Sequence, residues 1–142
     1  MDRGPIPLNA HAAMEPLIAI VIIAAPWIFG FSGADDAKAV CIAVGVIMLI
    51  AGALTDWRLS LARVIPLRTH LMTDLLLGAV LILSPFVLGF SGNGGATRFT
   101  IIAGVLEGLT ALATRWDPAE AAPSTVDRRS RATPAGHHRQ HG

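Results

Sequence analysis

Two histidine–carboxylate pairs recur along the chain with the same spacing. His11 is followed four residues later by Glu15, and His70 is followed four residues later by Asp74. Residues four apart lie on one face of a helix, so the members of each pair can share a proton or a hydrogen bond. The end of a membrane helix tolerates polar side chains better than its centre does. We therefore interpret both pairs as interfacial anchors in preference to a proton relay.

A further ionisable residue, Glu107, lies near the middle of an apolar run. A carboxylate at the centre of a bilayer is costly, so Glu107 should face other helices and be protonated or paired. Thr110 lies on roughly the same helix face and can share its hydrogen bonds. Gly104 and Gly108 have the GxxxG spacing that lets a neighbouring helix come close. Two interpretations stay open: Glu107 holds helices together, or Glu107 and Thr110 form a proton or cation site.

Enzymatic chemistry is not predicted. The chain shows no Ser-His-Asp set and no HExxH motif, and its single cysteine, Cys41, has no CxxC or zinc spacing. The histidines near the C-terminal end are a weak compositional indication of metal binding; they are His137, His138 and His141. We predict no catalytic residue, no metal site and no cofactor.

The net charge of +1 and the lack of aromatic residues in the basic C-terminal segment give no reason to expect a nucleic-acid partner.

The composition is that of a membrane protein. Hydrophobic residues make up 53% of the 142 residues, charged residues only 15%, and the mean hydropathy is +0.58. A soluble domain of this size has a large surface for its volume and needs more polar residues to cover it. Apolar runs separated by short charged loops are typical of a protein in a lipid bilayer.

The chain contains an internal repeat. A shift of 59 residues aligns His11 with His70 and Trp57 with Trp116, without a gap. We expect a first unit over residues 11–57, a connector over 58–69, a second unit over 70–116 and a tail over 117–142. The tail is rich in Pro, Ala, Ser, Arg and His and is expected to be disordered.

Each unit holds two apolar runs that are expected to be transmembrane helices. Their approximate ranges are 13–31, 37–55, 71–90 and 98–115. Only helices or closed barrels satisfy the backbone in lipid, and four such runs do not make a barrel. We therefore predict an all-α membrane protein of four helices, built as two helix pairs. Trp57 and Trp116, at the ends of the pairs, are expected to be interfacial anchors.

A proline–aromatic motif ends the first helix of each unit. It comprises Pro26, Trp27 and Gly30 in the first unit and Pro85, Phe86 and Gly89 in the second. Proline kinks a helix, an aromatic ring suits the membrane interface and glycine ends the helix. This structural interpretation is preferred to a ligand site at the kink.

Basic residues are distributed unequally over the two sides of the predicted bundle. One side has only Lys38 and Arg98, and the other has nine arginines: Arg3, Arg58, Arg63, Arg68, Arg115, Arg128, Arg129, Arg131 and Arg139. By the positive-inside rule, both termini and the connector lie in the cytoplasm. The connector is either a short amphipathic turn among the lipid headgroups or a plain loop.

The motifs resemble a known family. Ala25-Pro26-Trp27 and Ser84-Pro85-Phe86, each followed by a Gly-Phe-Ser-Gly turn, are similar to the motif of the bacterial SPW repeat family, named for Ser-Pro-Trp near the end of a transmembrane helix. The resemblance covers about residues 12–116. Ala25 replaces the serine in the first copy, and Phe86 replaces the tryptophan in the second. The resemblance implies a membrane protein of helix pairs and no established activity.

Three functions are weighed from the sequence. A structural or interaction component of the bacterial cytoplasmic membrane is preferred, with a homo-oligomer or another membrane protein as its partner. The alternative is a small proton or cation transporter, or a channel subunit, that uses Glu107. A membrane-embedded enzyme is the third and weakest candidate.

Overall fold

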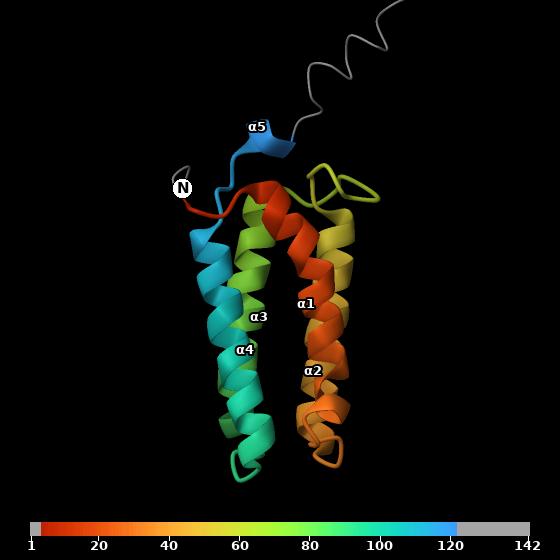
Figure 1. Ribbon diagram of the computed structural model, residues 1–142, viewed down its shortest axis with the longest axis vertical. Helices are drawn as coiled ribbons and strands as arrows, with labels where there is room; N and C mark the ends of the chain where they lie inside the picture. Colours follow the sequence, from red (N-terminus) through yellow and green to blue (C-terminus); the bar gives the residue numbers. More distant parts are fainter. Residues whose placement is uncertain (1–3, 122–142) are drawn as a thin grey trace, which may run out of the picture.

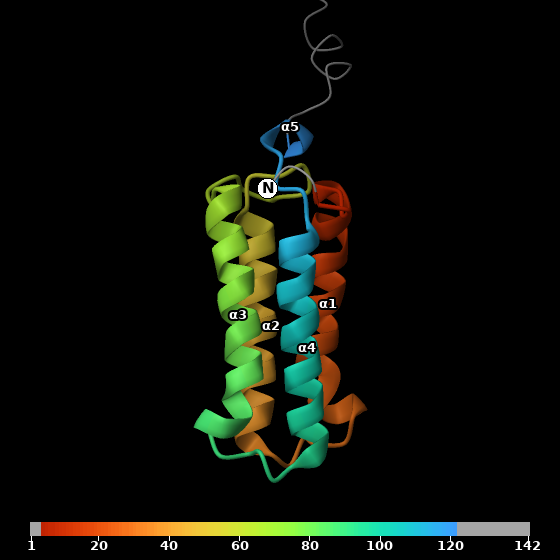
Figure 2. The same ribbon diagram turned by 90° about the vertical axis from the view of Figure 1, so that its left-hand side faces the viewer.

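A computed structural model describes residues 4–121 as an up-and-down bundle of four long helices with one short helix at its end (Figure 1). The elements are α1 (Leu8–Ile28), α2 (Asp35–Leu54), α3 (Leu67–Val87), α4 (Gly94–Ala113) and α5 (Pro118–Ala121). Short turns make α1 and α2 antiparallel neighbours, and likewise α3 and α4 (Figure 2). The prediction of an all-α protein with four long apolar helices is confirmed.

The four long helices are suited to a membrane. Each has 20 or 21 residues and is apolar enough to cross a bilayer. Large apolar side chains cover their outer faces; Leu17 is 65% exposed and Leu76 is 64% exposed. Soluble proteins rarely expose contiguous apolar surfaces of this extent, whereas lipid covers them without cost. The chain is therefore a multi-pass membrane protein.

The helices α1 and α3 begin earlier than the sequence pattern indicated. They start at Leu8 and Leu67, directly after Pro7 and Pro66, instead of near residues 13 and 71. Proline suits this place because its fixed φ fits a helix start and its missing N–H needs no partner there. The first turns include polar residues, which do not belong to an apolar run. The connector thus spans residues 55–66 and contains no helix.

The proline–aromatic motif lies where α1 and α3 end. Pro26 and Pro85 are in the last helical turn, and each helix stops two residues later. Gly30 and Gly89 follow with φ of 72° and 78°, a backbone conformation that side chains with a Cβ rarely adopt. The motif therefore ends the helix and turns the chain toward α2 or α4.

The aromatic residues at the two ends of the bundle differ in exposure. Trp27 and Phe86 are 58% and 62% exposed, as expected for rings at a lipid interface. Trp57 and Trp116 are only 1% and 7% exposed. The prediction that Trp57 and Trp116 are interfacial anchors is therefore wrong, because both rings pack inside the bundle.

Glycines set the close contact within each helix pair. A Cβ atom on Gly45 would lie 2.8 Å from the carbonyl oxygen of Ala19, and one on Gly104 would lie 2.5 Å from that of Gly78. The predicted role of Gly104 in close packing is confirmed. The backbone nitrogen of Gly108 would lie 3.4 Å from a Cβ atom on Gly78, so Gly108 is also at the contact between α3 and α4, although a Cβ atom on Gly108 itself would meet no atom within 4 Å among the described residues.

The segment directly after α4 is described as far as residue 121. The tail was expected to be disordered from residue 117, but residues 118–121 form α5. There the Glu120 carboxylate accepts a hydrogen bond of 2.8 Å from the backbone N–H of Leu8, at the start of α1. Residues 122–142, including His137, His138 and His141, lie outside the described part of the chain.

Candidate functional site

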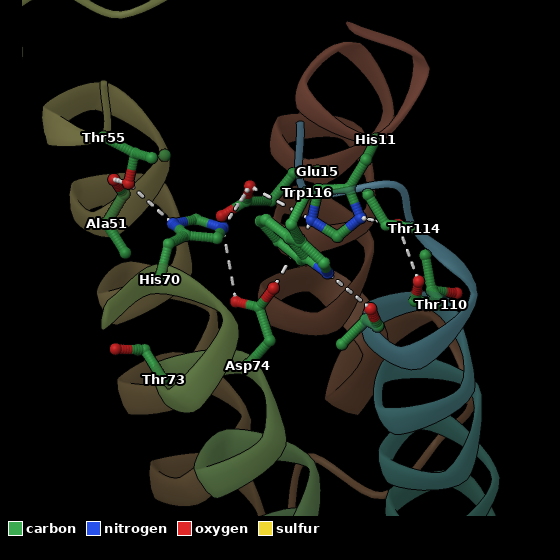
Figure 3. A network of polar contacts seen from close by, with 12 residues as sticks. His11, Glu15, Ala51, Thr55, His70, Thr73, Asp74, Thr110, Thr114 and Trp116 are labelled. Carbon is green, nitrogen blue, oxygen red and sulfur yellow. Dashed lines mark hydrogen bonds and ion pairs between the residues drawn. The ribbon is translucent and has the colours of Figure 1, made fainter. Parts of the chain in front are cut away.

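Four ionisable side chains converge inside the bundle at the end where the described chain starts and finishes (Figure 3). His11 and Glu15 come from α1, and His70 and Asp74 come from α3. They are 3%, 3%, 0% and 1% exposed, respectively. The interpretation of two separate interfacial anchors is therefore wrong: the two pairs form one buried group, which we call the His–carboxylate cluster.

Contacts in the cluster cross from one helix to the other. The Nε2 atom of His70 lies 3.0 Å from Oε2 of Glu15, and that of His11 lies 3.4 Å from Oδ2 of Asp74. The contacts within each helix are similar, at 3.3 Å between His70 and Asp74 and 3.8 Å between His11 and Glu15. Each imidazole thus faces both carboxylates, and the cluster joins the two halves of the chain.

Two threonines orient the imidazoles. The hydroxyl of Thr55 donates to the carbonyl oxygen four residues earlier and lies 2.7 Å from Nδ1 of His70. The hydroxyl of Thr114 donates in the same way and lies 3.0 Å from Nδ1 of His11. A hydroxyl has one hydrogen, so its oxygen must accept from the imidazole. Nδ1 therefore carries a hydrogen in both histidines, and Nε2 points at the carboxylates.

The buried tryptophans pack against the imidazoles. The Trp57 and His70 rings have centroids 4.5 Å apart, and the Trp116 and His11 rings have centroids 5.1 Å apart. Each indole N–H donates to a backbone carbonyl of the preceding helix, at 2.9 Å for Trp57 and 2.8 Å for Trp116. The rings are thereby fixed, and they shield the cluster from water.

Backbone pairing before α1 and α3 fixes the threonines. Ile6 exchanges hydrogen bonds with the end of α4 at Ala113 and Arg115, at 3.0 and 2.8 Å. Ile65 pairs equivalently with the end of α2, at 2.8 and 2.9 Å. Sequence reasoning missed these segments because it began the units at the histidines. The signal was present as Ile-Pro-Leu before each histidine, at the same shift of 59 residues.

Glu107 lies outside the cluster. It is 5% exposed and faces the bundle, as expected for a carboxylate within a membrane helix. Together with Thr110 it lines a groove of about 740 Å³ between α1 and α4, whose other lining residues are mostly apolar. Thr114 lies two helical turns nearer to the chain ends. The sequence thus identified a buried carboxylate correctly, and the larger polar group lies close enough for the charges of Asp74, Glu15 and His70 to act on Glu107.

The nitrogen and oxygen atoms of the cluster could bind a further group. Two imidazole Nε2 atoms and the four carboxylate oxygens of Glu15 and Asp74 are buried and have no hydrogen-bond partner outside the cluster within residues 4–121. Buried polar groups without partners are rare in native proteins, because each costs about 1–3 kcal/mol. Atoms of this kind, facing one another, are suited to holding a positively charged species.

Four apolar helices that enclose one polar cluster define a small multi-pass membrane protein. The chain belongs to the SPW repeat family: the model of the SPW repeat domain matches residues 9–114. This match includes the whole His–carboxylate cluster and both threonines that orient it. No curated protein matches the chain, and no solved structure does.

Proposed function

We propose that this protein is a non-enzymatic structural component of the bacterial cytoplasmic membrane that binds a cation in the His–carboxylate cluster. The observation that carries the proposal is the set of six buried nitrogen and oxygen atoms that face one another and have no hydrogen-bond partner outside the cluster within residues 4–121. A bound cation would join α1 to α3 and close this end of the bundle. A partner in the membrane would then bind to a bundle in which α1 and α3 are held together at this end.

The order hydroxyl, imidazole, carboxylate in Thr55, His70 and Glu15 is also that of a catalytic triad. In a triad the imidazole accepts the proton of the nucleophile. Here the threonine hydrogen is engaged with a backbone carbonyl, and Thr55 is fully buried. This geometry supports an orienting role for the threonine and a protein without enzymatic activity.

The proposed location of the cluster is the cytoplasmic end of the bundle. Figure 1 shows the start of α1, the connector and α5 at one end, and the cluster lies there. The excess of arginine at this end supports a cytoplasmic orientation by the positive-inside rule. The cation would then come from the cytoplasm.

Thermal unfolding of the purified chain in lipid nanodiscs tests the proposal. A ligand that binds only the folded state at 100 times its Kd stabilises that state by about 2.7 kcal/mol. After treatment with a chelator, at least one ion among Na⁺, K⁺, Mg²⁺, Ca²⁺, Mn²⁺ and Zn²⁺ should raise the Tm of the parent. The double variant Glu15→Gln and Asp74→Asn should lose this shift. A Tm that no ion changes, or a shift that persists in the variant, would contradict cation binding by the cluster.

A proton or cation transporter that uses Glu107 is the second candidate. The observation that favours it is the position of Glu107 and Thr110 on the groove between α1 and α4. Liposomes that contain the purified protein would then show proton or cation flux, and Glu107→Gln would abolish it. Without flux, the structural component is preferred.

We also infer that the two halves are tandem repeats related by an axis along the membrane normal. An even number of spans in each half keeps both halves in the same orientation. Equivalent contacts at the 59-residue shift support this inference, as in His70 with Thr55 and His11 with Thr114. An experimental structure in which the halves superpose would verify it.

A homo-oligomer or another membrane protein is the proposed partner, and cross-linking in intact membranes would identify it.

A further inference from the structure

The nitrogen–oxygen contacts of the His–carboxylate cluster are close to the separations that a small metal ion imposes. A tetrahedral ion with ligands about 2.1 Å away holds its ligand atoms about 3.4 Å apart. The four nitrogen–oxygen contacts of the cluster measure 3.0, 3.3, 3.4 and 3.8 Å; both histidines contact Oε2 of Glu15, whereas Asp74 faces His70 with Oδ1 and His11 with Oδ2. One ligand atom each of His11, His70 and Asp74 also lies within 4.8 Å of the other two. With Asp74 binding through one or both of its oxygens, small adjustments of these side chains would bring the two Nε2 atoms and Oε2 of Glu15 around the same ion.

The histidines are already oriented for metal binding. A metal-binding imidazole typically coordinates through one nitrogen and donates its other N–H to a fixed acceptor, which sets the ring orientation. Because the hydroxyls of Thr55 and Thr114 donate to backbone carbonyls, we assign the Nδ1–H groups of His70 and His11 as donors to these hydroxyls. Their Nε2 atoms have no hydrogen-bond partner outside the cluster among the described residues. Each Nε2 lone pair is thereby free to bind an ion.

The charge of the cluster favours a divalent ion. As metal ligands, the two imidazoles are neutral and the two carboxylates are ionised, so the four ligands together carry two negative charges. A buried net charge is costly unless it is compensated. The side chains within hydrogen-bond or ion-pair distance of Glu15 and Asp74, in the part of the chain described, include no lysine or arginine. A dication would make the site neutral.

We propose that His11, Glu15, His70 and Asp74 form a binding site for a divalent first-row transition-metal ion, with two nitrogen and two oxygen ligands. This inference rests on the proposed function, since it names the cation that the cluster binds. Imidazole nitrogen together with carboxylate oxygen suits Zn²⁺, Fe²⁺ or Mn²⁺ better than Mg²⁺ or Ca²⁺, which prefer oxygen ligands alone. Zn²⁺ and Co²⁺ are the probes of choice.

Metal content and affinity test the site. The full-length chain is purified with a tag that contains no histidine, and the three histidines near its C-terminal end are replaced by alanine, so that they cannot bind the probe. After equilibration with Zn²⁺ and removal of the free ion, elemental analysis should find one zinc ion per chain. Co²⁺ should give the intense visible absorption of a tetrahedral complex.

Variants assign the ion to the cluster. The double variant His11→Ala and His70→Ala should lose the bound zinc. Thr55→Val keeps all four ligands but removes the acceptor of the Nδ1–H group, and it should weaken zinc binding about 10- to 100-fold. Cys41→Ala removes the thiol from the apolar core and should leave zinc binding unchanged, which makes it the matched control. If the histidine variant fails to fold, the same loss is measured with Glu15→Gln.

Two results would overturn the metal site. One is a folded parent chain that binds no zinc and shows no cobalt absorption. The other is zinc that remains bound with unchanged affinity in the cluster variants. If Na⁺, K⁺, Mg²⁺ or Ca²⁺ stabilises the parent and Zn²⁺ and Co²⁺ do not, the transition-metal inference fails while the proposed cation binding stands. If no ion stabilises the parent, both fail.

Discussion

The carboxylate of Glu15 packs against the backbone of Gly52, where a Cβ atom would lie 3.1 Å from Oε1 and 3.2 Å from the carboxyl carbon. At the 59-residue shift, Asp74 is equivalent to Glu15 and Ala111 is equivalent to Gly52. The longer carboxylate therefore goes with glycine and the shorter one with alanine. Asp74 has one methylene group fewer than Glu15, and Ala111 has one methyl group more than Gly52, so the two pairs fill a similar volume.

This match in size predicts a specific coupling between two substitutions. Gly52→Ala should displace the Glu15 carboxylate and lower the free energy of unfolding by about 1–3 kcal/mol, the usual cost of overpacking. Adding Glu15→Asp recreates the pair of the second half and should recover most of this loss. Unfolding in mixed micelles measures all members of the double-mutant cycle. Additive effects of the two substitutions would show that the residues are not matched in size.

Two glycines of α4 provide a second prediction. A Cβ atom on Gly104 would meet the backbone of Gly78 at 2.5 Å, so Gly104→Ala must push α3 and α4 apart. We expect it to lower the free energy of unfolding by about 1–3 kcal/mol. Gly108→Ala is the control, since nothing described lies within 4 Å of the added methyl group. It should leave stability unchanged or raise it by up to about 1 kcal/mol, because alanine favours a helix more than glycine does. Equal losses in the two variants would contradict close packing at Gly104 as the cause.

The helices and their order followed from the sequence because lipid imposes simple requirements. A membrane helix must be long and apolar, and these two properties can be counted along the chain. The boundaries were less accurate, because the first turns of α1 and α3 contain polar residues and are packed inside the bundle. Hydropathy does not separate a polar residue in a buried turn from one in a loop. Pro7 and Pro66 were the signals that marked these boundaries.

The candidate site was predicted only in its parts. Spacing alone placed His11 with Glu15 and His70 with Asp74, because a helix fixes which residues share a face. It does not fix which way that face turns, and this depends on packing between α1 and α3. Thr55 and Thr114 matched at the same shift, but their hydrogen bonds to the histidines join residues far apart in the sequence. The helical periodicity of the sequence does not predict hydrogen bonds between residues on different helices.

Membrane topology is the third prediction. Fusions should place the C-terminal end in the cytoplasm and the turn between α3 and α4 outside. Alkaline phosphatase, which is active only outside the cytoplasm, should be inactive after Gly142 and active when inserted in the turn at residues 93–95. Green fluorescent protein at the same positions should give the opposite pattern. Phosphatase activity after Gly142 would place the His–carboxylate cluster on the outer side.

The last prediction concerns Glu107, the equivalent of Met48 at the 59-residue shift. Glutamine keeps the shape of glutamate and its capacity for hydrogen bonds, but it cannot ionise. If Glu107 only links helices, Glu107→Gln should change the free energy of unfolding by less than about 0.5 kcal/mol and leave cation binding by the cluster as in the parent. We expect this result, because Glu107 forms none of the ion pairs of the cluster among the described residues. Thermal unfolding and zinc titration of the two proteins, together with flux in liposomes, provide the comparison. Flux that the parent shows and that Glu107→Gln loses, while Glu15→Gln retains it, would make the groove between α1 and α4 the functional site.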